Sequence, residues 1–148
     1  MMKAFLKLAA AAILAGCAAN AAMARPLVPA ENRYRPFTAD LPACDEANVL
    51  GTITSRFQQK ESEYWNSTLE IKEFDHIRES GFRSNGKDYI PRRYCTARAG
   101  MSDLKHRPVV YTVIERAGII GISWGVEWCV DGLDRNNAYA PACRAERH

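Results

Sequence analysis

Gly121, Ser123 and Gly125 match the Gly-x-Ser-x-Gly pattern that presents a nucleophilic serine in many hydrolases. That chemistry needs a sharp turn between a strand and a helix, because such a turn exposes the serine hydroxyl. Here the serine lies in a run of alternating apolar and small residues, and no helical pattern follows it. The pattern therefore predicts a strand rather than a catalytic serine, with glycines that leave room for a neighbouring element.

Three histidines are the next candidates for acid–base or metal chemistry. His76 follows Asp75, but neighbouring residues on a strand point to opposite faces, so we expect no side-chain hydrogen bond between them. His106 lies in a basic turn, and His148 is the last residue. None of the three has partners at metal-ligand spacing, so the sequence predicts neither a metal site nor a cofactor.

Four cysteines beyond the first 24 residues carry the clearest chemical signal; they are Cys44, Cys95, Cys129 and Cys143. They contain no Cys-x-x-Cys motif and no metal-ligand spacing. An even number of cysteines in a small exported domain predicts two disulfides rather than a catalytic thiol.

The first residues have the features of an export signal. Lys3 and Lys7 supply a positive region, and the apolar run that follows at 8–16 is too short to span a bilayer. Such a signal predicts a bacterial protein that is exported to the periplasm.

Two cleavage sites are compatible with this signal. Segment 22–24 (Ala-Met-Ala) has the small-x-small form cut by signal peptidase, which gives a signal peptide of residues 1–24. Segment 14–17 (Leu-Ala-Gly-Cys) instead matches the lipobox of bacterial lipoproteins, which gives a signal of residues 1–16 and an acylated Cys17. We favour the lipobox because its four residues are specific. The lipid would anchor the protein to the outer membrane.

The rest of the chain divides into a linker and one domain. Prolines recur in residues 25–42 without apolar periodicity, which predicts an extended linker. Residues 43–148 are expected to form a single globular domain, because this length supports one core but not two.

Segment 44–66 carries the convincing helical pattern of the sequence. Asp45 can cap its start. Apolar residues at three-to-four spacing predict one buried stripe, formed by Val49, Leu50, Ile53, Phe57 and Tyr64. Glu61 belongs to the charged and amide residues that are expected to form the solvated side.

Strand patterns follow the helix. We expect strands at 68–77 and 92–101, and two more within 108–130 that form a hairpin with its turn at 117–118. A break of phase between Phe74 and Ile77 predicts a bulge, and the stretch after it is expected to be irregular until the second strand. The last strand alternates cleanly, so its even-numbered residues predict one buried face: Ile120, Ile122, Trp124, Val126, Trp128 and Val130.

These elements predict an α+β fold. One N-terminal amphipathic helix packs on a four-stranded, mostly antiparallel sheet, and two disulfides staple the domain. In a meander Cys95 would begin the second strand and Cys129 would end the fourth, roughly 20 Å apart. Disulfides join Cα atoms within about 7 Å, so this pairing is excluded. We prefer Cys44–Cys95 and Cys129–Cys143.

The charge of the chain is small but unevenly placed. Its formal net charge is +3, and loss of two lysines with the signal leaves it near neutral, so nucleic acid is not an expected partner. The densest basic group comprises Arg92, Arg93, Arg98, Lys105 and Arg107. This group either pairs with the acidic helix or forms a binding patch for a lipid headgroup, a polyanionic glycan or an acidic envelope protein.

Four segments of the chain resemble a family of uncharacterised small exported proteins of alphaproteobacteria. They are residues 41–45 (Leu-Pro-Ala-Cys-Asp), 64–67 (Tyr-Trp-Asn-Ser), 89–98 (Tyr-Ile-Pro-Arg-Arg-Tyr-Cys-Thr-Ala-Arg) and 124–129 (Trp-Gly-Val-Glu-Trp-Cys). The resemblance covers most of the mature domain. It implies an exported bacterial protein, and it assigns neither an activity nor catalytic residues.

The expected function is a non-enzymatic binding or accessory role in the cell envelope, because the apolar pattern is used by the core and leaves loops and a basic edge as working surface. One alternative is a small enzyme with a pocket between helix and sheet, where Ser123 and Glu127 would meet Asp75 or His76. Another is an inhibitor of a cell-wall-active enzyme.

Overall fold

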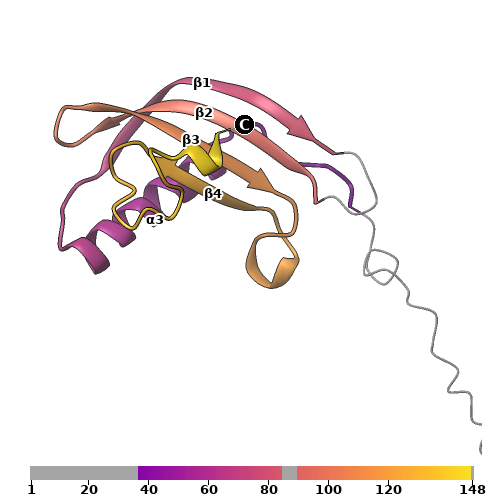
Figure 1. The fold of residues 1–148 in the computed structure, drawn as a ribbon. Coiled ribbons are helices and arrows are strands. Elements are labelled where there is room, and N and C mark those ends of the chain that lie inside the picture. The colour runs from indigo at the N-terminus through magenta and orange to yellow at the C-terminus, as the bar shows by residue number, and fades with distance from the viewer. Residues whose placement is uncertain (1–36, 85–89, 148) are drawn as a thin grey trace, which may run out of the picture. The chain divides into compact units, whose positions relative to one another are not determined.

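The computed structural model describes residues 37–84 and 90–147. One helix precedes four strands, in the order α3 (Ala47–Trp65), β1 (Ile71–Arg83), β2 (Arg92–Met101), β3 (His106–Ile114) and β4 (Gly125–Val130). All neighbouring strands pair antiparallel in one sheet of order β1-β2-β3-β4 (Figure 1). The predicted α+β class is confirmed, and so are the bounds of the strand expected at 92–101.

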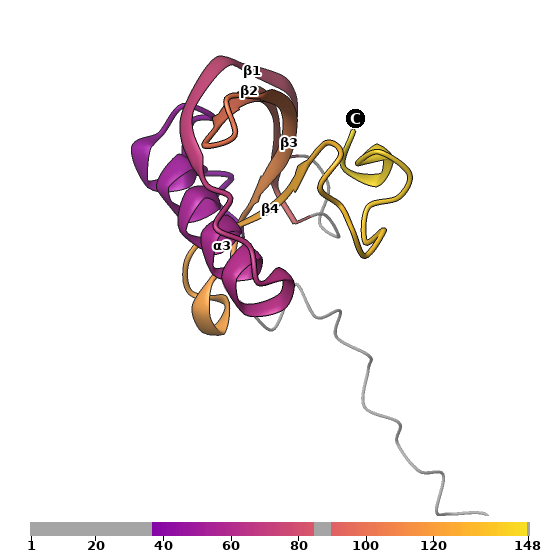
Figure 2. The ribbon, with the colours of Figure 1, turned by 90° about the vertical axis from the view of Figure 1, so that its left-hand side faces the viewer.

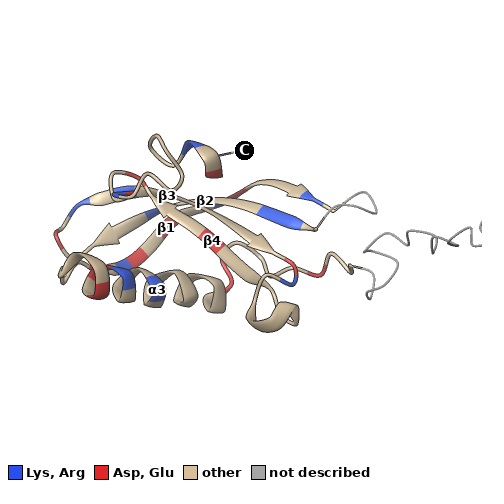
Figure 3. Cartoon of the chain, turned by 60° about the horizontal axis from the view of Figure 1, so that its bottom comes forward, with Lys and Arg blue, Asp and Glu red and all other residues tan. Residues whose placement is uncertain are grey.

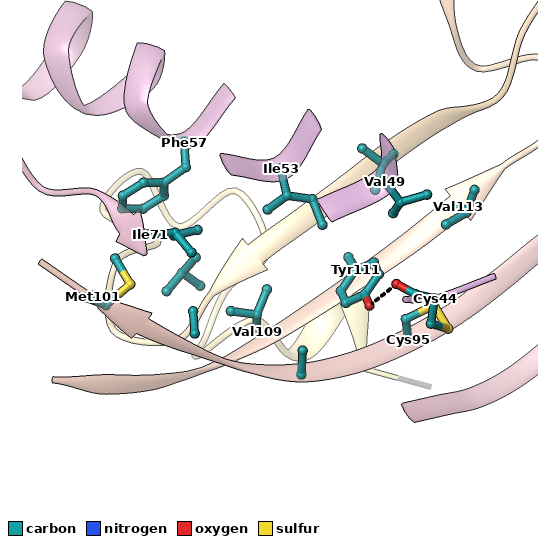
Figure 4. Packing of buried hydrophobic residues seen from close by; sticks show 14 of the residues in the cluster. Cys44, Val49, Ile53, Phe57, Ile71, Cys95, Met101, Val109, Tyr111 and Val113 are labelled. Atoms are coloured by element: carbon teal, nitrogen blue, oxygen red, sulfur yellow. Dashed lines mark hydrogen bonds between the residues drawn. A yellow bond between two sulfur atoms is a disulfide. The ribbon is translucent and has the colours of Figure 1, made fainter. Parts of the chain in front are cut away.

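Helix α3 packs on one face of the sheet through a single row of side chains. Val49, Ile53 and Phe57 are four residues apart, almost fully buried, and directed at the sheet (Figure 4). They join a core with Val109 and Tyr111 of β3. Spacing of four residues keeps side chains on one side of a helix, so this row forms the contact with the sheet.

The predicted helix face needs two corrections. Tyr64, expected in the buried stripe, is 72% exposed, whereas Glu61, expected in solvent, is 2% exposed. Arg135 explains the burial, because it donates to Glu61 Oε2 at 2.9 Å and its guanidinium lies over the Trp65 ring. Asp45 makes no cap, because the helix begins after Glu46 and has no side-chain cap.

Strand β1 is longer and less regular than predicted. It runs on to Arg83, into a stretch expected to be irregular, and its 13 residues pair with the 10 residues of β2. The register shifts three times, between residues 71 and 73, 75 and 78, and 79 and 81. The middle shift confirms the predicted bulge, and His76 within it has a φ of 50°.

Strand β4 is shorter than predicted, because the residues before it form a loop. Ile119–Gly121 is a 3-10 turn, in which Ile120 and Gly121 have positive φ values of 56° and 68°. Left-handed backbone breaks the two-residue alternation of a strand. The prediction that Ile120 and Ile122 lie on the buried face is therefore wrong, and both side chains are in solvent.

The two predicted disulfides are present, Cys44–Cys95 and Cys129–Cys143. The argument against Cys95–Cys129 reached the right result for a wrong reason. Cys95 pairs with Tyr111 and Cys129 pairs with Val110, so the two cysteines lie at nearly the same level of the sheet. They are separated by two strand spacings, about 10 Å, and they belong to different hydrophobic clusters on opposite faces.

The two disulfides indicate an oxidising location outside the cytoplasm. Within residues 37–84 and 90–147, no helix has the length and apolar character needed to cross a membrane.

Segments at both ends of the described chain pack on the sheet. The C-terminal segment 131–147 lies on the face opposite α3 (Figure 2), where Cys143 is fully buried. At the other end Leu41 joins the core, and the backbone N–H of Thr38 donates to Glu115 at 3.0 Å. The folded domain therefore begins before residue 43, within the segment predicted to be linker.

Candidate functional site

A cavity of about 450 Å³ opens on the face of the sheet opposite α3. Strands β1, β2 and β3 and the C-terminal turn supply its lining. Its polar side chains are Arg78, Arg98, Arg147, His76, Ser80, Thr96 and Glu146. We call this the outer cavity; its volume lies in the range of small-ligand sites.

Asp75 positions two of the residues that line the outer cavity. Arg98 donates to its carboxylate from Nε and Nη2, both at 2.7 Å, and His76 Nδ1 lies 2.9 Å from Oδ1. The hydrogen bonds from Arg98 and then from His76 hold the pKa of Asp75 well below its usual range. The prediction that Asp75 and His76 do not bond is wrong, because the bulge ends strict strand alternation at His76.

Glu146 is the carboxylate of the cavity lining, and it comes from the short turn Arg144–Glu146. Burial raises its pKa above the ordinary value of 4.5, while the hydroxyl of Thr112, donating at 2.8 Å, acts in the opposite direction. Glu127 adds to the rise and Arg92 opposes it. The acid is thus more easily protonated when folded than when unfolded.

Replacing Glu146 by glutamine is expected to change how stability depends on pH. Because the pKa of Glu146 is higher in the folded than in the unfolded protein, the protonated acid stabilises the fold. This contribution to the free energy of unfolding is complete below pH 4.5 and is lost as the pH rises through the folded pKa. Wild-type protein should therefore lose stability as the pH rises from 4.5 through the folded pKa, and the Glu146→Gln variant should keep it, since the amide can still accept from Thr112. Urea unfolding at several pH values measures the difference.

The control for this experiment is Glu63→Gln, which removes an exposed carboxylate of α3. Parallel stability profiles for wild type and Glu146→Gln would contradict the assigned role of burial.

The five basic residues singled out in the sequence do not gather into one patch. Figure 3 shows lysines and arginines spread over several elements of the described chain. Arg98 alone among them lines the outer cavity. Arg92 and Arg93 lie at the start of β2, whereas Lys105 and Arg107 lie at and after the β2–β3 turn, at the far end of the sheet.

One of the two alternatives predicted that these cations pair with acidic residues of the helix. Most of them do have acidic partners, but the partners do not lie on α3. Arg93 pairs with Glu79 of β1, and Arg92 lies 3.9 Å from a carboxylate oxygen of β4. Arg107 binds both oxygens of Asp103 at 2.9 and 2.7 Å, which lowers the pKa of Asp103 to about 2. Neutralisation is thus local, between strands of the same sheet and within a turn.

The arrangement does not assemble the alternative active site. Core side chains fill the contact between α3 and the sheet, and the described cavity lies on the other face. Ser123 is exposed in the loop before β4, and Glu127 faces Arg92. Neither of them lines the cavity with His76.

Sequence reasoning missed most of the cavity. Arg78 and Ser80 fall in the last part of β1, beyond the bulge, and Glu146 and Arg147 fall in a segment with loop composition. Cys143 was the feature of the sequence that could have located Glu146 and Arg147. Its disulfide to Cys129 of β4 brings the residues next to it onto the sheet. In the described part of the chain no group of three or more histidines, cysteines or acids is suited to hold a metal.

The lipobox, Cys17 and both cleavage sites lie outside the described residues. Comparison with protein-family models gave no match, and comparisons with curated proteins and with solved structures found no significant similarity.

Proposed function

We propose that this protein is a non-enzymatic binding protein of the bacterial cell envelope that holds an anionic group, a carboxylate or a phosphate, in the outer cavity. The observation that carries the proposal is the polar lining, which contains three arginines and one histidine but only one carboxylate. Guanidinium groups suit this ligand class, because their planar N–H donors match two oxygens at once.

Arg78 is the arginine best placed to receive the ligand. Arg98 and Arg147 are already engaged by carboxylates of Asp75 and Asp131. Arg78 is exposed, and among the described residues it has no carboxylate within salt-bridge distance. An incoming anion would therefore gain a cation without displacing an existing partner.

Purified protein is expected to bind inorganic phosphate or glucuronate, measured by calorimetry, and not neutral glucose. Arg78→Glu should weaken binding at least about tenfold, because a hydrogen bond to a charged group contributes roughly 1.5–3 kcal/mol. Lys105→Glu is the matched control, since it makes the same charge change in the β2–β3 turn, away from the cavity lining.

Equal weakening by Lys105→Glu would reveal general charge attraction and contradict a site in the outer cavity. Absence of binding by the wild type to both anions would contradict it too. Thermal unfolding of each variant checks that the fold is retained.

We also propose that the protein is exported to the periplasm and anchored to the outer membrane through an acylated Cys17. The lipobox supports the anchor, and the disulfides together with the resemblance to small exported alphaproteobacterial proteins support the export. Mass spectrometry of the mature N-terminus tests the anchor. An acylated Cys17 supports it, whereas an unmodified N-terminal Arg25 contradicts it.

A further inference from the structure

The loop between β3 and β4 exposes three large apolar side chains in one turn. Ile119, Ile120 and Ile122 are 81%, 88% and 82% exposed. The eight residues 117–124, which we call the isoleucine loop, include no charged residue. The loop projects from the end of the sheet where β3 ends and β4 begins (Figures 1 and 2). Clustered exposed apolar side chains mark surfaces that contact a partner or a membrane.

The backbone of the isoleucine loop is closed on itself. The N–H of Gly118 donates to the carbonyl of Ser123 at 2.9 Å. The N–H groups of Gly121 and Ile122 donate to the carbonyls of Gly118 and Ile119, both at 3.2 Å. A Cβ on Gly118 would lie 2.1 Å from Ser123 Oγ, so glycine allows the two sides to approach. Internal hydrogen bonds lower the cost of moving a backbone out of water.

The N-terminal segment meets the domain beside the root of this loop. The Arg116 guanidinium lies 4.8 Å from the centre of the Phe37 ring, and the neighbouring Glu115 carboxylate accepts from the backbone N–H of Thr38. A chain anchored at Cys17 would thus reach the domain at the end that carries the isoleucines.

We propose that the isoleucine loop inserts into the apolar boundary of a lipid bilayer and docks the domain on the membrane. This inference rests on the proposed location in the envelope and is independent of anion binding in the outer cavity. A lipid surface fits the loop better than a protein, because a stable protein interface covers about 800 Å² on each partner. A single projecting turn with three isoleucines offers a small convex contact instead.

The test uses the exported protein carrying Cys17→Ser, so that no acyl chain contributes, and vesicles of phosphatidylethanolamine and phosphatidylglycerol. We expect the protein to sediment with the vesicles, also at high salt, where screening weakens adsorption by charge. Ile120→Ser combined with Ile122→Ser should lower the partition coefficient about 100-fold, roughly tenfold for each buried isoleucine.

Leu104→Ser is the matched control, because Leu104 is 91% exposed in the β2–β3 turn, at the other end of the sheet. It should leave vesicle binding unchanged. The inference fails if the wild type does not sediment with vesicles, if the loop variant binds as well as the wild type, or if Leu104→Ser lowers binding equally. It also fails if the loop substitutions instead abolish a dimer seen by light scattering, which would make a second copy the occupant.

Phosphate and glucuronate binding by the loop variant separates this inference from the proposed function. It should equal that of the wild type, because the loop does not line the outer cavity. If the double loop variant lost anion binding as well as vesicle binding, it would be misfolded, and its loss of vesicle binding would no longer support membrane docking. Single Ile120→Ser and Ile122→Ser variants that retain anion binding then decide the matter by the same sedimentation measurement.

Discussion

Replacing Cys44 and Cys95 together by alanine is expected to lower the free energy of unfolding by about 4 kcal/mol. This disulfide spans 51 residues of sequence, so it restricts the unfolded chain strongly. The corresponding variant of Cys129 and Cys143, whose separation is 14 residues, should lose about 3 kcal/mol.

The Cys44–Cys95 disulfide is also part of the hydrophobic core. Cys44 and Cys95 are both buried, and the carbonyl of Cys44 accepts a hydrogen bond of 2.7 Å from the Tyr111 hydroxyl (Figure 4). A domain of this size has a total stability of about 5–15 kcal/mol, so the variant should unfold at markedly lower urea concentration. Urea unfolding without reductant compares the two variants. A larger loss of unfolding free energy on removal of Cys129–Cys143 than on removal of Cys44–Cys95 would contradict this prediction.

The second large effect is expected at Phe57. Its side chain is 2% exposed and its ring centre lies 5.9 Å from that of Trp128. Phe57→Ala removes this ring from the contact between α3 and the sheet, so it should cost about 3–5 kcal/mol in unfolding free energy. Thermal or urea unfolding measures the loss.

Tyr64→Ala is the control for Phe57, because both residues lie on α3 and both belong to the stripe expected from the sequence. Tyr64 is 72% exposed, so its replacement should change stability by no more than about 0.5 kcal/mol. Similar losses at the two positions would mean that the helix face is the predicted one and that the corrected face is wrong.

The fold was predictable where one periodic pattern decides burial. The stripe of Val49, Ile53 and Phe57 marks the helix, and the pattern at 92–101 marks a strand with both bounds correct. Glu61 escaped prediction because its burial depends on Arg135, which comes from a segment without any pattern. Local periodicity carries no record of a partner 74 residues away.

The candidate site was less predictable than the fold. Alternation from Ile120 onward imitated a strand, although a left-handed turn interrupts it and leaves the isoleucines in solvent. Arg98 was singled out for the density of basic residues around it, and it does line the outer cavity. Arg78 and His76 reach the same cavity through a bulge whose local geometry sequence reasoning did not supply.

The irregularity of β1 has a consequence for how the molecule meets other chains. β1 is an edge strand, and all three extra residues of its pairing with β2 lie in β1 itself. Each bulge interrupts the regular row of N–H and C=O groups that an added strand would need. Charged side chains such as Lys72 and Glu79 stand along the same edge. The longest strand of the sheet is therefore a poor template for β-aggregation, although it has 13 residues and lies at the edge of the sheet.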